Sequence, residues 1–196
     1  VPTSANAYVV LFDQYGNYRS WKKATVQWAL AGNGSKDLSM EEIKSAVGGA
    51  IDAWQNVTCS SLNFSFGGVV NANPNKDIFI RWWENSWYPE AQDAAGLTTN
   101  WIVGPGGPKK VEIFFNGLSF TWATSGTDDP FSNATDVQAV ATHEIGHAIG
   151  LDHHSASVHY FIQLELEKFK NLIDEVPLRN CSLYGLRSLG GYCDRI

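Results

Sequence analysis

HEIGHAIGLDH, at residues 143–153, contains the residues that decide both the fold and the chemistry of this chain. His143 and His147 are four residues apart, so on a helix their rings leave the same face about one turn apart. Gly150 can adopt the left-handed conformation that ends a helix, and the turn would bring His153 back toward the other two histidines. Three neutral imidazoles that leave a fourth position to water are the ligand set of a catalytic zinc site.

Glu144 follows the first histidine and could reach a water molecule on the metal without being a ligand. The alternative interpretation is an ordinary helix with histidines on its surface, because HExxH alone arises by chance. The glycine and the third histidine at fixed offsets favour zinc. Asp152 falls one residue short of the third-ligand position, and His154 is the nearest rival to His153.

The segment before the zinc motif predicts a helix that holds the ligands rigidly. Thr135 is expected to cap this helix, with Gln138 as its capping-box partner. A buried helix is a suitable support for a precise site. A second helical stripe is predicted over residues 161–176. The apolar face of the first helix consists of Val137, Val140, Ala141, Ile145, Ala148 and Ile149.

The upstream half of the chain predicts a sheet with one helix packed on it. Ser39 begins that helix, and Glu42 completes a capping box. Apolar residues from Ile43 to Trp54 recur at helical spacing, and Gly48-Gly49 in their midst would allow close approach to a sheet. Alternating or β-branched patterns predict five strands, at residues 25–30, 62–66, 77–82, 94–99 and 111–115.

Composition narrows the class of protein. A chain of 196 residues suits one domain, and no apolar run approaches the ~20 residues of a membrane span. A net charge of −6 argues against a nucleic-acid partner. Tryptophans such as Trp82, Trp83, Trp87 and Trp101 suggest a binding surface, but packing on the sheet is the simpler interpretation.

The ends of the chain and its cysteines bear on its compartment. The chain opens at Val1 without a signal-peptide core, which suggests a mature, trimmed fragment. Cys59, Cys181 and Cys193 permit one disulfide and one free thiol, or none. Cys181 with Cys193, and Cys59 with Cys181, are both open pairings, and composition alone does not fix the compartment.

The motif HExxHxxGxxH resembles the zinc motif of the metzincin metallopeptidases. Three segments look like the matrixin branch: WKKATVQWAL at 21–30, VEIFFN at 111–116 followed by Trp122, and DVQAVATHEIGHAIGLDH at 136–153. With the order of the predicted elements, the resemblance covers roughly residues 20–154. His154 stands where astacins carry glutamate, which argues against that branch.

The resemblance implies an α+β, zincin-like fold with two long helices and a twisted five-stranded mixed sheet. Residues 1–196 would form a single catalytic domain, with an upper subdomain at about 1–153, a short C-terminal subdomain at about 154–196 and the active-site cleft between them. One antiparallel edge strand, around Gly96 and Leu97, would run along the cleft and pair with an extended peptide substrate.

Two positions depart from the family pattern. The sole methionine is Met40, so the turn at 157–160, where metzincins place a methionine below the zinc, either carries His159 in the methionine position or has lost the methionine. Tyr160 resembles a tyrosine that assists the oxyanion in some branches. Phe114 and Asn116 replace ligands of a structural zinc and calcium, so one catalytic Zn2+ is expected and Ca2+ is undecided.

These features predict a secreted, monomeric zinc endopeptidase that acts on proteins or peptides, with Glu144 as general base. A zinc-binding module without catalytic activity is the main alternative, and a metal-free scaffold is a third. The missing methionine is the only feature that favours the non-catalytic module.

Overall fold

The computed structural model describes residues 9–13, 15–16, 18–57, 60–71, 75–102, 108–124 and 133–153. Several predictions fall outside these residues: the three cysteines, the turn at 157–160 with His159 and Tyr160, His154, the helix at 161–176 and the lower subdomain.

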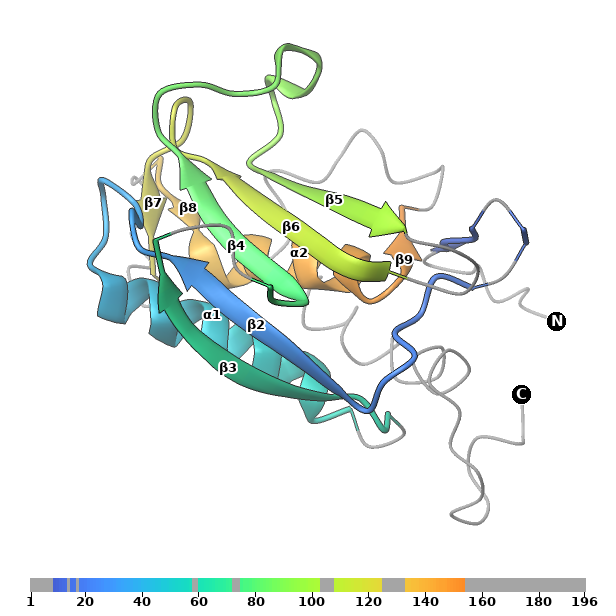
Figure 1. Cartoon of the computed structure of the whole chain (residues 1–196). Coiled ribbons are helices and arrows are strands. Elements are labelled where there is room, and N and C mark those ends of the chain that lie inside the picture. Colours follow the sequence, from blue (N-terminus) through green and yellow to red (C-terminus); the bar gives the residue numbers. More distant parts are fainter. Residues whose placement is uncertain are drawn as a thin grey trace, which may run out of the picture.

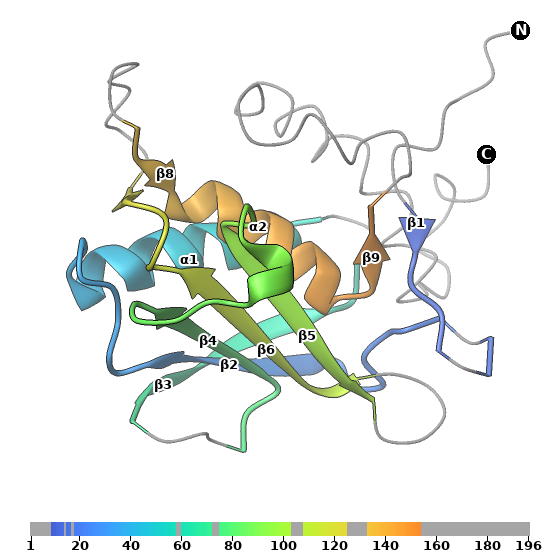
Figure 2. The ribbon, with the colours of Figure 1, turned by 90° about the horizontal axis from the view of Figure 1, so that it is seen from above.

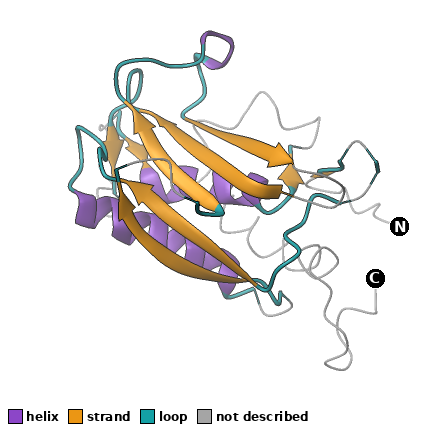
Figure 3. Cartoon of the chain, viewed as in Figure 1, coloured by secondary structure: helices purple, strands orange, loops and turns teal. Residues whose placement is uncertain are grey.

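A five-stranded mixed sheet forms the centre of the molecule, as predicted (Figures 1 and 3). Its strand order is β3-β2-β4-β6-β5, and only β5 runs antiparallel to its neighbour. The strands are β2 (Thr25–Ala31), β3 (Asn63–Val70), β4 (Ile78–Trp83), β5 (Gly96–Ile102) and β6 (Pro108–Asn116).

Among the described residues, four short strands form two small two-stranded sheets apart from the main sheet. β1 (Val9–Val10) pairs with β9 (Leu151–Asp152), and β7 (Trp122–Ala123) pairs with β8 (Thr135–Asp136). A single 3-10 turn, η1 (Pro89–Ala91), lies between β4 and β5.

Strand β3 is longer than the predicted segment at 62–66. Its pairing with β2 continues to Val70 after a register shift between Trp28 and Leu30. Gly68, with φ of +99°, absorbs the extra residue of this bulge. The hydrophobic alternation is lost at the two glycines, Gly67 and Gly68, so the pattern ends before the backbone pairing does.

Helix α1 (Met40–Gln55) begins as the capping box predicts. The Ser39 hydroxyl accepts a hydrogen bond from the Glu42 backbone N–H, and the Glu42 carboxylate accepts one from Ser39. Both long helices lie on one face of the sheet (Figure 2), where their apolar residues join the main core. The buried residues of α1 are Ile43, Ala46, Val47, Ala50, Ile51 and Trp54.

The two helices also pack against each other, and this corrects the expectation for the glycine pair. A Cβ atom on Gly49 would lie 2.9 Å from the side chain of Gln138, so the close approach is to helix α2 (Val137–Ala148), not to the sheet. The indole N–H of Trp54 donates to the carbonyl of Thr142 at 2.8 Å, and that of Trp21 donates to Ala148 at 3.0 Å.

The tryptophans of β4 pack on both faces of the sheet. Trp82 is 2% exposed and stacks on Phe115 with ring centroids 4.4 Å apart. Trp83 lies on the opposite face, stacked on Tyr88 and edge-on to Phe114. These contacts fit the packing interpretation of both residues. In the part of the chain that the structure describes, no helix is long and apolar enough to cross a bilayer.

The Trp54 hydrogen bond should contribute measurably to stability because it joins the two helices inside the core. Replacing Trp54 with Phe should lower the free energy of unfolding by about 1–3 kcal/mol, since one buried hydrogen bond and part of the packing are lost. Urea denaturation checks this. Trp87→Phe, which removes an indole bond to Ala91 only four residues away, should cost less. An equal loss of unfolding free energy in the two variants would contradict the stabilising role of the Trp54 hydrogen bond.

Candidate metal centre

Helix α2 carries the first two histidines and begins one residue later than predicted. The N-cap is Asp136, whose carboxylate accepts a 2.6 Å hydrogen bond from the backbone of Ala139. Thr135, the expected cap, lies one residue before this position in the short strand β8. Gln138 packs against Gly49 and makes no capping box. The predicted apolar face is otherwise confirmed: Val137, Ala141, Ile145, Ala148 and Ile149 are buried, and Val140 is partly buried against the core.

The helix ends at a turn that redirects the chain, as the sequence predicts. Gly150 has φ of +105°, and its N–H donates to the carbonyl of His147 at 3.0 Å. A Cβ atom on Gly150 would overlap the carbonyl oxygen of Arg19, so only glycine fits. The Gly150 carbonyl in turn accepts from Leu11, and β9 then pairs with β1. The N-terminal segment therefore fixes the turn that brings His153 back toward His143 and His147.

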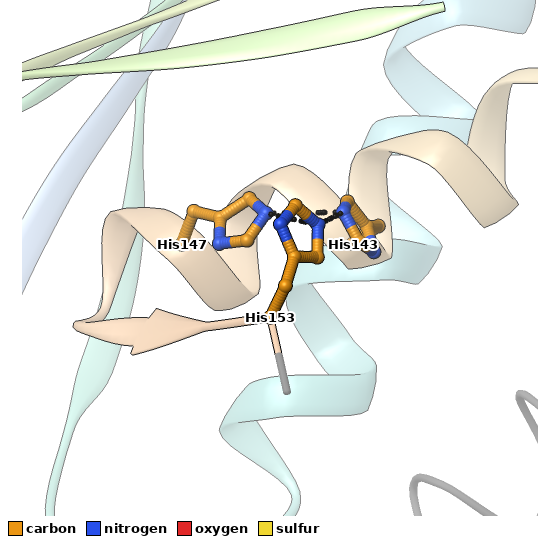
Figure 4. Close-up of side chains that lie close together, drawn as sticks. All are labelled: His143, His147 and His153. Carbon is orange, nitrogen blue, oxygen red and sulfur yellow. Dashed lines mark hydrogen bonds between the residues drawn. The ribbon is translucent and has the colours of Figure 1, made fainter. Parts of the chain in front are cut away.

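The three histidine rings converge, and their Nε2 atoms face one another (Figure 4). The separations are 2.9 Å between His143 and His153, 3.0 Å between His143 and His147, and 3.2 Å between His147 and His153. Three tetrahedral nitrogen ligands at roughly 2.0–2.1 Å from zinc would stand about 3.3 Å apart. The observed spacing therefore fits one zinc ion held by three imidazoles.

Hydrogen bonds around the rings support this arrangement. The Nδ1 atom of His147 lies 2.8 Å from the carbonyl of Leu151, and because a carbonyl only accepts, the proton is on Nδ1 and the Nε2 lone pair is free for a metal. The carboxylate of Asp152 accepts from the backbone N–H of His153 at 2.8 Å. Asp152 thus supports the third histidine and is not part of the converging group.

The electrostatics of the cluster favour neutral imidazoles. Burial, reinforced by repulsion from His147 and His153, lowers the pKa of His143 to about 3. Burial likewise lowers the pKa of His147 and of His153. All three rings are therefore uncharged near neutral pH, which is the form that binds a metal cation.

Glu144 is 5% exposed, and its side chain lies against strand β5. The hydroxyl of Thr98 is 2.5 Å from Oε2, and a Cβ atom on Gly96 would lie 2.6 Å from Oε1. Burial raises the pKa of Glu144 to about 7, although the hydrogen bond from Thr98 lowers it. A carboxyl group with a pKa near neutrality is suited to exchange a proton.

Thr98 contacts Glu144 directly, and the sequence did not single it out. Gly96 and Thr98 are two residues apart on a strand, so both face α2. The alternation was visible in the sequence, but the distance from this strand to the zinc helix was not. Leu97 points to the other face, where it is paired with Phe114 across the β5–β6 ladder.

The positions that would carry further metal ligands serve the local structure instead. Phe114 is buried against aromatic side chains. The fully buried Asn116 donates from its amide to Ala94 at 3.1 Å and accepts from Ser119 at 3.0 Å. In the described ranges, the three histidines are the group of side chains that could hold a metal ion.

Comparisons with known proteins agree with this geometry. The sequence model of the matrixin family matches residues 20–175. Matrix metalloproteinase-25 of Mus musculus is 34% identical over 139 residues, which is 69% of this chain and 21% of the relative. Karilysin of Tannerella forsythia is 29% identical over 142 residues, 70% of this chain and 27% of the relative. The chain thus spans about a fifth to a quarter of the length of these relatives.

The turn at Gly150 should tolerate no side chain. Gly150→Ala should lower the free energy of unfolding by more than about 2 kcal/mol, because the left-handed backbone is strained for alanine and the methyl group meets Arg19. It should also weaken zinc binding, since His153 is displaced.

A second glycine provides the control for this variant in the same assays. A Cβ atom on Gly48 meets no atom within 4 Å, and Gly48→Ala should stabilise α1 by about 1 kcal/mol. Thermal denaturation and elemental analysis measure both effects. Gly150→Ala with unchanged stability and full zinc content would refute the role of the turn.

Zinc should be retained to lower pH than free histidine would allow. Metal binding needs neutral rings, and the pKa values of the three histidines are lowered from 6.5, so protons compete only at greater acidity. Zinc content after dialysis should be constant between about pH 8 and 6.5 and should fall as the pH drops toward about 3. Loss of zinc already above pH 6.5 would contradict the pKa shifts.

Proposed function

The chain belongs to the matrixin family of metallopeptidases, and on that premise we propose that it is a zinc-dependent endopeptidase that hydrolyses peptide bonds of proteins. The observation that carries the proposal is that the nitrogens of three neutral histidines converge on one point, beside the helix that also carries the buried Glu144. Histidine ligation that leaves a position for water is the arrangement of catalytic zinc.

The proposed mechanism divides the chemistry between metal and protein. Zinc, when bound, supplies a Lewis acid that polarises a carbonyl group and lowers the pKa of water toward about 7. His143, His147 and His153 hold it through Nε2. Glu144 accepts a proton from the attacking water at a carboxylate oxygen and then gives it to the departing amine. Burial raises the pKa of this carboxyl group, which favours its return of the proton to the amine.

Strand β5 is the proposed platform for the substrate. It pairs with β6 on one side, and no other described strand pairs with its second edge. An extended peptide could add there as a further antiparallel strand, with backbone hydrogen bonds at Gly96. The backbone groups of Leu97, the second residue expected at this platform, are directed at Phe114 of β6, so we expect no backbone pairing with the peptide from Leu97. Such pairing would lay the scissile bond beside the Glu144 carboxylate, because Gly96 lies against it. Tyr160, outside the described residues, is proposed to assist the oxyanion.

The remaining features of the enzyme are proposed from family membership. Residues 1–196 would form one catalytic domain, with the cleft between an upper part at about 1–153 and a lower part at about 154–196. We expect a secreted monomer that acts on protein or peptide substrates and binds one catalytic zinc, with calcium undecided. The non-catalytic alternative is disfavoured, because a module that merely binds has no need of a buried glutamate in this position.

Glu144→Gln should remove catalysis while leaving the metal in place. The amide cannot accept the proton of the attacking water, so kcat on a quenched peptide should fall at least about a hundredfold, with zinc content unchanged. Chelation should abolish the activity of the wild-type chain, and added zinc should restore it.

Glu90→Gln provides the matched control, because Glu90 is exposed on the η1 turn and the chemical change is the same. It should retain wild-type activity. Full activity of Glu144→Gln would exclude Glu144 as the base, and a zinc-loaded wild-type chain that cleaves no peptide would favour the binding module.

A further inference from the structure

The Glu144 carboxylate is held by one edge strand from two sides. Its Oε1 atom lies against the backbone of Gly96, where a Cβ atom would come within 2.6 Å, and its Oε2 atom is 2.5 Å from the hydroxyl of Thr98. The same hydroxyl is 3.0 Å from the carbonyl of Glu144. One threonine therefore contacts both ends of the glutamate.

We propose that Thr98 is a positioning residue that fixes the Glu144 carboxylate in its reactive orientation through its hydroxyl group. The inference rests on the proposed function, since it concerns the residue assigned as general base. It adds a residue from outside the zinc motif to the catalytic apparatus.

The hydroxyl is a firm anchor because its own position is constrained. Thr98 pairs with Ile113 in the β5–β6 ladder, and Ile113 is fully buried. A β-branched side chain on a strand has few accessible χ1 rotamers, so the oxygen cannot easily swing away. The threonine hydroxyl has one proton, and the shorter contact shows the carboxylate as its favoured acceptor.

The carboxylate needs such an anchor because it stands at the end of a flexible side chain. A glutamate side chain has three rotatable bonds, and Gly96 presents only backbone beside it. A hydrogen bond to an ionised group is stronger than one between neutral groups, so the Thr98 hydroxyl can select one rotamer. The expected consequence is on the chemical step, since a misplaced base loses rate while the substrate still binds.

Thr98→Val tests the proposal because valine keeps the shape and removes the hydroxyl. On a quenched peptide, kcat should fall roughly ten- to a hundredfold, the loss expected from one hydrogen bond to a charged group. KM should stay within about twofold, and zinc content should be unchanged. Thr98→Ser, which restores the hydroxyl, should recover most of the activity. Thr25→Val, at an exposed site on β2, should behave like wild type.

A double-mutant cycle gives a readout that does not depend on turnover. Urea unfolding of the zinc-loaded full chain is measured for Thr98→Val, Glu144→Ala and the double variant. The two substitutions should be non-additive, because each removes the same hydrogen bond. The pair Thr25→Val and Glu144→Ala should be additive.

The outcomes separate this inference from the proposed function. An unchanged kcat in Thr98→Val, a loss that Thr98→Ser does not recover, or an additive cycle would overturn the role of Thr98. These results would leave the peptidase proposal intact if Glu144→Gln is inactive and wild type is active. A wild-type chain without peptidase activity would defeat the proposed function, and the cycle would then decide alone whether Thr98 positions Glu144.

Discussion

The backbone of Gly150 passes so close to the carbonyl of Arg19 that no side chain fits between them, and the metal centre depends on this contact. The helix that carries two ligands must stop and reverse within three residues for the third ligand to return. A left-handed glycine provides the reversal, and the hydrogen bond between Leu11 and Gly150 secures it to the N-terminal segment. The geometry of the three imidazoles is thus set by backbone sterics.

The burial of α2 in the core also fixes the positions of the histidine rings. Three ring nitrogens about 3 Å apart repel one another when protonated. The helix holds two of these rings in place because its other face is fixed in the core, and the turn at Gly150 holds the third. Trp54 and Trp21 attach the helix to α1 and to the start of the chain through hydrogen bonds to its carbonyl groups. The low exposure of Glu144, which raises its pKa, follows from the packing of α2 against β5.

Local rules predicted the parts of the site that are close in sequence. The spacing of His143, His147 and His153 with Gly150 was sufficient because a helix turn and a glycine turn have fixed geometry. The capping box at Ser39 was equally local, and the edge strand followed from the family resemblance. The partner of Gly49 and the contact of Thr98 with Glu144 depend on how separate elements meet in space. No pattern of spacing along the chain encodes those distances. The cap at Asp136 is a local hydrogen bond from Ala139, but the neighbouring Thr135 was an equally acceptable cap by type.

The indole of Trp21 reaches a carbonyl that lies 127 positions further along the chain. Such a contact closes almost the whole described domain into one loop, so it can form only after the sheet has brought the two ends together. The last turn of α2 must therefore leave the ribosome before the indole of Trp21 can reach its acceptor, the carbonyl of Ala148. We expect the metal centre for this reason to be among the last parts of the molecule to assemble. A chain shortened near residue 150 would carry all five strands of the sheet but would lack His153, the third ligand.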